Sequence, residues 1–87
     1  MSRISSFYGI LIRMYYNEGI HALPHVHVQC GAEEASVAFD GTILGGSLSR
    51  QTARAVRDWA SLHEDELMAN WLRARAGEAL EKVDPLP

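Results

Sequence analysis

Residues 24–31 read Pro-His-Val-His-Val-Gln-Cys-Gly, and this stretch decides the fold. Valines alternate with histidines, and successive side chains of a strand point to opposite faces. The pattern therefore predicts a strand over residues 25–30. If the two valines point into the core, both imidazoles emerge together on the opposite face. Imidazole titrates near neutral pH and is a common metal ligand. The face that carries His25 and His27 is therefore the candidate functional surface.

Residues 7–16 precede this strand and read Phe-Tyr-Gly-Ile-Leu-Ile-Arg-Met-Tyr-Tyr. Their alternation predicts one strand with a continuously apolar, buried face. The buried face would hold Tyr8, Ile10, Ile12, Met14 and Tyr16, and the opposite face Phe7, Gly9, Leu11, Arg13 and Tyr15. Residues 17–19 predict a turn and residues 20–24 a loop. Pairing of the two strands would place Arg13 and Tyr15 beside the histidines.

Two more strands are predicted after the histidine strand. Residues 34–39 alternate again between apolar and polar or small positions. Asp40-Gly41 is a strong hairpin signal, because glycine accepts a positive φ and aspartate tolerates it. Residues 42–44 then form a short fourth strand, which Gly45-Gly46 is expected to close.

The second half of the chain has the period of a helix. One helical face is marked by steps of three or four residues, at Val56, Ala60, His63, Leu67, Trp71 and Ala74. Ser49 is the predicted N-cap and Gly77 the predicted C′ residue. One unbroken helix over 50–76 would be about 40 Å long, whereas the expected radius of gyration is about 12 Å. Two helices with a break near Leu62-His63 are therefore predicted.

These elements predict a single α+β domain over residues 1–87. An antiparallel meander of three to four strands would span about 4–46, and two C-terminal helices packed on one face of it about 49–76. Residues 77–87 would form an extended tail. Trp59 and Trp71 are expected to anchor the core between sheet and helices.

Composition limits the classes of function. The chain has 87 residues, a formal net charge of −3 and one cysteine. This charge gives no reason to expect general nucleic-acid binding, and one cysteine excludes an internal disulfide. No apolar run reaches the length of a membrane span, and no apolar leader is present, so we expect a cytoplasmic protein without a membrane partner. Arg50, Arg54 and Arg57 form one basic stripe on a helix, which is a candidate partner-binding surface.

Several segments together resemble one bacterial family. They are residues 4–10, Met14-Tyr15, residues 24–28, and residues 62–67 through Asn70-Trp71. This set is similar to the family called domain of unknown function 4160, over nearly the whole chain. The family pattern reads Pro-Pro-His-Phe-His, from which this chain departs at Leu23 and Val26. The resemblance implies a small prokaryotic protein encoded beside another small protein, and hence either component of a toxin–antitoxin-like module.

We therefore expect a protein that binds a small protein partner and needs no cofactor. The alternative is a small enzyme, a ribonuclease or metal-dependent hydrolase, with His25, His27, Arg13 and Tyr15 as catalytic candidates and RNA as the alternative partner. In a third interpretation the histidines are ordinary surface residues of the strand, which bond Asp40 or Ser36 or line a protein interface. An open sheet edge also leaves a homo-oligomer as an alternative.

A metal site is a further alternative. Zinc and nickel both accept imidazole nitrogens, so His25, His27 and His63, or a carboxylate of Asp40 or Glu64 in place of the last, could form a ligand set. Strand parity argues against this set. His63 lies on the helix stripe that faces the sheet, whereas the other two histidines are predicted on the opposite side.

Overall fold

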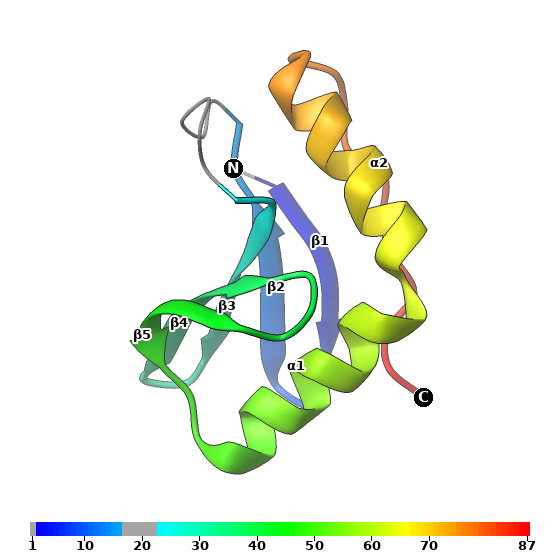
Figure 1. The fold of residues 1–87 in the computed structure, drawn as a ribbon. Coiled ribbons are helices and arrows are strands. Elements are labelled where there is room, and N and C mark those ends of the chain that lie inside the picture. Colours follow the sequence, from blue (N-terminus) through cyan, green and yellow to red (C-terminus); the bar gives the residue numbers. More distant parts are fainter. Residues whose placement is uncertain (1, 17–22) are drawn as a thin grey trace.

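Five antiparallel strands followed by two helices make up the fold (Figure 1). The computed structural model describes residues 2–16 and 23–87. The elements are β1 (Ser2–Phe7), β2 (Ile10–Met14), β3 (His25–Cys30), β4 (Glu33–Ala38), β5 (Ile43–Ser47), α1 (Arg50–Leu62) and α2 (Glu64–Arg75). The strands pair in chain order, so the sheet is a meander with β3 at its centre. The predicted α+β class is confirmed, with five strands in place of three to four.

The first predicted strand is in fact a hairpin. Instead of one strand over 7–16, the chain reverses at Tyr8-Gly9, whose φ values are 53° and 77°. Two central residues with positive φ are what a two-residue hairpin turn requires for its twist to match the flanking strands. Tyrosine rarely adopts this conformation, so Gly9 is the one local signal for the turn, and the alternation that runs through it predicts a single strand. Tyr8, expected in the core, is 66% exposed, and Phe7, expected on the opposite face, is buried.

The remaining strand predictions hold in part. Ile10, Ile12 and Met14 are buried as predicted. The turn at Asp40-Gly41 is also confirmed, with a φ of 94° at the glycine. The turn predicted at 17–19 and residues 20–22 of the predicted loop, His21 among them, lie outside the described residues.

β5 continues through Gly45-Gly46, which were expected to end it. A Cβ on Gly46 would lie 2.2 Å from the carbonyl oxygen of Glu34. The backbones of β4 and β5 therefore approach this closely only because residue 46 has no side chain. A bulge precedes this contact, because Val37 pairs with Ile43 and Ser36 with Gly45, so that Leu44 is the extra residue.

The ends of both helices follow the predicted signals. The Ser49 side chain accepts a hydrogen bond from the backbone N–H of Thr52 at 3.2 Å, which caps α1. α1 ends at Leu62 and α2 begins at Glu64, so the predicted break falls at His63. Gly77 has a φ of 73° and follows α2, where the N–H of Glu78 donates to the carbonyl oxygen of Arg73 at 2.8 Å.

One hydrophobic core lies between the helices and the sheet face that they cover. Trp59 and Leu67 are fully buried and Trp71 is 4% exposed, so the two tryptophans anchor the core as predicted. From the sheet, Val26 and Val28 of β3 contribute to the same cluster. Helices of 13 and 12 residues that fold back on the sheet give a radius of gyration of 11.7 Å.

The C-terminal tail, residues 76–87, lies against β1 and both helices. The N–H of Val83 donates to the carbonyl oxygen of Ile4 at 2.8 Å, and the indole N–H of Trp59 donates to the carbonyl oxygen of Asp84 at 2.8 Å. Asn70, 1% exposed, bonds both backbone groups of Glu81 at 2.8 and 3.0 Å. The tail is thus fastened to β1 on one side and to the helices on the other.

Replacing Asn70 by alanine is expected to lower the free energy of unfolding by about 2–4 kcal/mol, because two backbone groups lose a buried partner. Chemical denaturation followed by tryptophan fluorescence measures the change. Ser61→Ala is the control, because it removes one exposed hydrogen bond to Asp58 and should cost less than about 0.5 kcal/mol. Equal losses in the two variants would contradict the role of Asn70 as a clamp.

Candidate functional site

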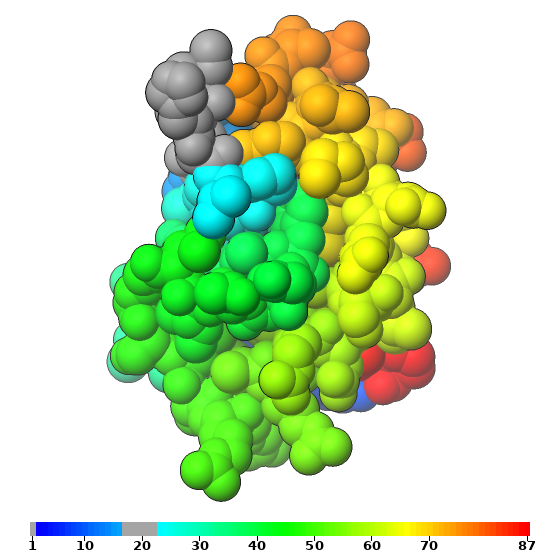
Figure 2. Space-filling model, in the orientation of Figure 1, coloured from blue at the N-terminus to red at the C-terminus, as the bar shows by residue number. Residues whose placement is uncertain are grey.

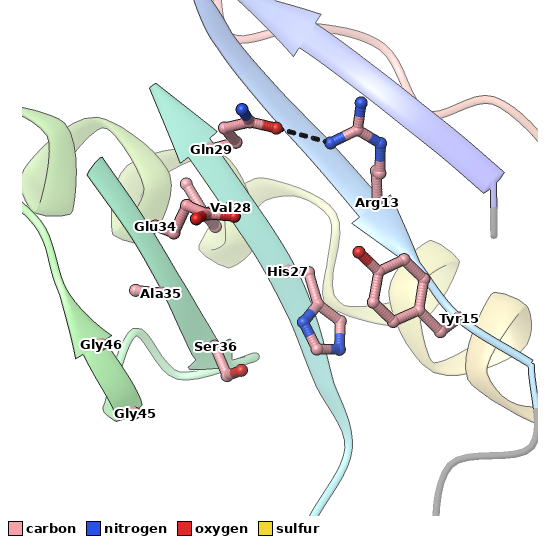
Figure 3. A pocket seen from close by; sticks show the side chains of 10 residues that line it. All are labelled: Arg13, Tyr15, His27, Val28, Gln29, Glu34, Ala35, Ser36, Gly45 and Gly46. Atoms are coloured by element: carbon pink, nitrogen blue, oxygen red, sulfur yellow. Dashed lines mark hydrogen bonds between the residues drawn. The ribbon is translucent and has the colours of Figure 1, made fainter. Parts of the chain in front are cut away.

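The sheet face opposite the helices carries most of the predicted site residues, and we call it the outer face. Arg13 pairs with His27, and His27 pairs with Ser36, so their side chains share this face across β2, β3 and β4. Alternation along the strands places Gln29 and Glu34 on the same face (Figure 3). The structure thus brings Arg13 and His27 together through strand register alone.

Two contacts orient the functional groups of the outer face. Nη1 of Arg13 donates to Oε1 of Gln29 at 2.8 Å. The rings of Tyr15 and His27 stack with centroids 4.1 Å apart and planes 27° from parallel. Because each of these side chains stays partly exposed, the outer face presents a guanidinium, a phenol and an imidazole to solvent in fixed positions.

A shallow hollow of about 260 Å³ opens between these side chains. Its lining includes Gly45 and Gly46 of β5. Figure 3 shows that these glycines leave the β5 side of the hollow without side chains. The other walls are mostly polar, with Gln29, Glu34 and Ser36 supplying hydrogen-bond donors and acceptors. The hollow can therefore take a flat or polar group that reaches the stacked rings.

His25 does not share the open position of His27. Its ring lies 5.0 Å from that of His27 and 5.3 Å from that of Trp71, and the residue is only 8% exposed. Figure 2 shows the segment at the start of β3 directly against α2. The expectation that both imidazoles are exposed on one face is therefore wrong for His25, because α2 covers the first residue of β3. Nδ1–H of His25 donates to the carbonyl oxygen of Leu23 at 2.6 Å, which leaves Nε2 as the basic nitrogen of the neutral ring.

The proposed third metal ligands serve local structure. Nδ1 of His63 lies 2.6 Å from Oε1 of Glu66, and its ring lies 5.8 Å from that of Trp59. Asp40 accepts a hydrogen bond from the N–H of Thr42 at 2.9 Å, and the bonds from Thr42 lower the pKa of its carboxyl. Glu64 begins α2, where the helix dipole favours a carboxylate.

The described residues do not bring together the ligand set considered above as an alternative. In residues 2–16 and 23–87, no three His, Cys, Asp or Glu side chains gather as a set that could hold a metal ion. The ligand set of His25, His27 and His63 is therefore not assembled, and the helix junction keeps His63 with its own partners.

The predicted basic stripe forms as expected on α1. Arg50, Arg54 and Arg57 are all exposed. The stem of Arg57 lies against the β4–β5 turn, because a Cβ built on Gly41 would be 2.7 Å from Cγ of Arg57. The stripe therefore continues from the helix to the hairpin that ends in β5.

One residue of the outer face was missed by the sequence analysis. Arg3 pairs with Arg13 across β1 and β2, so two arginines stand opposite each other on neighbouring strands. The signal was present in Gly9. A hairpin at residues 8–9 folds the N-terminal residues back along β2, whereas one strand over 7–16 leaves Arg3 unplaced.

A family model described as Domain of unknown function (DUF4160) matches residues 9–72, most of the 87-residue chain. The chain therefore belongs to this family, as its sequence resemblance implied. The match runs from the β1–β2 turn into α2 and so includes the histidine strand. Searches of curated proteins and of solved structures gave no match. In the part of the chain that the structure describes, neither helix has the length and apolar character needed to span a membrane.

Elemental analysis tests the metal alternative. Protein purified without a polyhistidine tag is expected to contain less than about 0.1 equivalent of zinc or nickel, because a zinc site needs at least three protein ligands. A variant with His25→Ala and His27→Ala should give the same reading. One full equivalent in the parent protein that disappears in this variant would contradict the expectation.

Proposed function

We propose that this chain, a member of a family whose description assigns no activity, binds a protein partner. The partner is a small protein that adds an extended segment to the free edge of β5. The two proteins form a cytoplasmic, toxin–antitoxin-like module. The observation that carries the proposal is the difference between the two edges of the sheet.

The β1 edge is covered by the chain itself. In the tail, the backbone N–H of Val83 donates to the carbonyl oxygen of Ile4, and Nζ of Lys82 donates to the carbonyl oxygen of Arg3 at 2.6 Å. An edge strand with unpaired backbone groups is a template for pairing with another chain, and covering it is one way in which proteins prevent this. The tail therefore protects β1.

The β5 edge has no such protection among the described residues. β5 is the last strand of the sheet, its sequence Ile-Leu-Gly-Gly-Ser has no charge and no proline, and all five residues are exposed. The bulge places Leu44, 42% exposed, beside Leu23 at an open hollow of about 390 Å³. Strand addition takes its affinity from backbone hydrogen bonds and its specificity from pockets for alternate side chains. β5 and this hollow offer both.

The arginine stripe of α1 extends the same surface. Two residues, Leu48 and Ser49, separate β5 from α1, and Ser49 caps the helix. None of the guanidinium groups of Arg50, Arg54 and Arg57 is paired with a carboxylate of residues 2–16 or 23–87. Unpaired like charges at neighbouring helix positions repel each other, and an acidic partner relieves this cost. The proposed partner therefore carries carboxylates next to its added strand.

Leu44→Lys tests the docking mode. The substitution should weaken binding of the small protein encoded beside this chain by about tenfold or more, because a charge in an edge strand opposes strand addition and fills the apolar hollow. The matched control is Leu72→Lys on α2, where the leucine is 61% exposed, and it should leave the Kd unchanged. Calorimetry on the purified pair gives both values. Equal affinities for the two variants would show that the partner does not use β5.

The stacked Tyr15 and His27 beside Arg13 favour a second candidate, a small ribonuclease or other hydrolase. Imidazole moves protons near neutral pH, and a guanidinium binds phosphate.

His27→Gln separates the two functions. If the chain is an enzyme toxin, this variant should lose growth inhibition while it still binds its partner, because glutamine keeps a polar side chain but cannot transfer a proton. Growth curves and co-purification provide the two readouts. Growth inhibition that survives in His27→Gln would exclude the enzyme candidate.

A further inference from the structure

A row of side chains crosses the outer face from one edge of the sheet to the other. Arg3, Arg13, His27, Ser36 and Gly45 are successive cross-strand partners, one from each strand. Directly opposite residues of neighbouring strands have their Cβ atoms about 5 Å apart. Two arginines and an imidazole therefore stand next to one another at the β1 side of the row, and the glycine leaves its β5 side open.

The two arginines form an unfavourable pair without a ligand. Like charges directly opposite on neighbouring strands are destabilising. Arg13 donates to the neutral amide of Gln29, which orients its guanidinium without neutralising it. No carboxylate of residues 2–16 or 23–87 forms an ion pair with either arginine. A bound anion would satisfy both guanidinium groups, and planar guanidinium forks match the oxygens of a phosphate.

The groups next to the arginines suit a nucleotide. The Tyr15–His27 stack, at 4.1 Å, is partly exposed and borders the hollow whose β5 side is formed by glycines. Any of the nucleic-acid bases can stack on an aromatic side chain, because every base has a π-face. Gln29, Glu34 and Ser36 in the hollow can donate to or accept from a base edge or a ribose hydroxyl.

We infer that the outer face binds a single-stranded RNA segment. Arg3 and Arg13 hold its phosphates, a base stacks at Tyr15 and His27, and the hollow takes a base edge or ribose. An acidic peptide fits less well, because the stacked rings of Tyr15 and His27 would have no role in binding it. The inference goes beyond the proposed protein partner, which docks at the β5 edge and α1.

The net charge of −3 bears on how this site would work. A chain with a negative net charge does not attract nucleic acid over long distances, so the binding depends on local contacts. With two phosphates neutralised, log K should fall with log salt at a slope of about −1.4 for a single strand. A steep slope is expected only for a broad basic surface.

Fluorescence anisotropy with a labelled 2′-O-methyl oligoribonucleotide of about twelve nucleotides tests the inference, since this probe resists cleavage and matches the site sizes of single-strand binders. The variant Arg3→Gln/Arg13→Gln should bind about tenfold more weakly and lose most of the salt dependence. Arg50→Gln/Arg54→Gln on α1 is the control, because it changes the net charge equally. It should bind within about twofold of the parent protein.

Tyr15→Leu supplies an independent readout. Loss of the stacking ring should weaken binding about tenfold with an unchanged salt slope, whereas the arginine variant changes both. Circular dichroism and thermal unfolding confirm that each variant is folded. Equal binding by the two arginine double variants, or displacement of the RNA by a polyglutamate peptide at equal concentration, would overturn the inference. The Kd for the protein partner is also measured with both arginine double variants. Only Arg50→Gln/Arg54→Gln on α1 should change this Kd.

Discussion

Burial of Val26 and Val28 on the central strand is the constraint on which the other features depend. β3 pairs with β2 on one side and β4 on the other, so its register fixes which residues of both neighbours point into the core. A slip of one residue would move every side chain to the opposite face and bring the histidines under the helices. The same register that buries the valines places His27 between Arg13 and Ser36. Core and outer face are thus two consequences of one alternation.

The tail makes the two sheet edges unequal. Asn70 and Trp59 hold the backbone of residues 81 and 84, and the residues between them contact β1. The β1 edge is therefore closed by the same core residues that pack the helices on the sheet. At the other edge, two glycines let β5 approach β4 closely but add no side chain that would cover its free side. This asymmetry directs any strand addition to β5.

The outer face gathers its polar groups without a catalytic or metal-binding motif in the sequence. Arg13 lies in β2, Tyr15 directly follows this strand and His27 lies in β3, so these side chains meet because antiparallel pairing aligns β2 with β3. A helix decides which histidine remains accessible, since Trp71 packs on His25 and leaves His27 with Tyr15. The arrangement provides positive charge, an aromatic stack and a polar hollow on one side of a thin sheet.

Local signals in the sequence determined the order of strands and helices, the alternation of β3, the caps at Ser49 and Gly77, and the break at His63. These features depend on neighbouring residues, through side-chain period, φ preference and the unsatisfied groups of helix ends. The Tyr8-Gly9 hairpin is not predicted because tyrosine rarely adopts a positive φ, so that Gly9 is the one local signal for the turn. Tertiary structure alone decided that Arg3 stands opposite Arg13, that Asn70 clamps the tail and that Trp71 covers His25. These contacts join residues far apart in sequence, and their formation depends on how the sheet and helices pack together rather than on any local pattern.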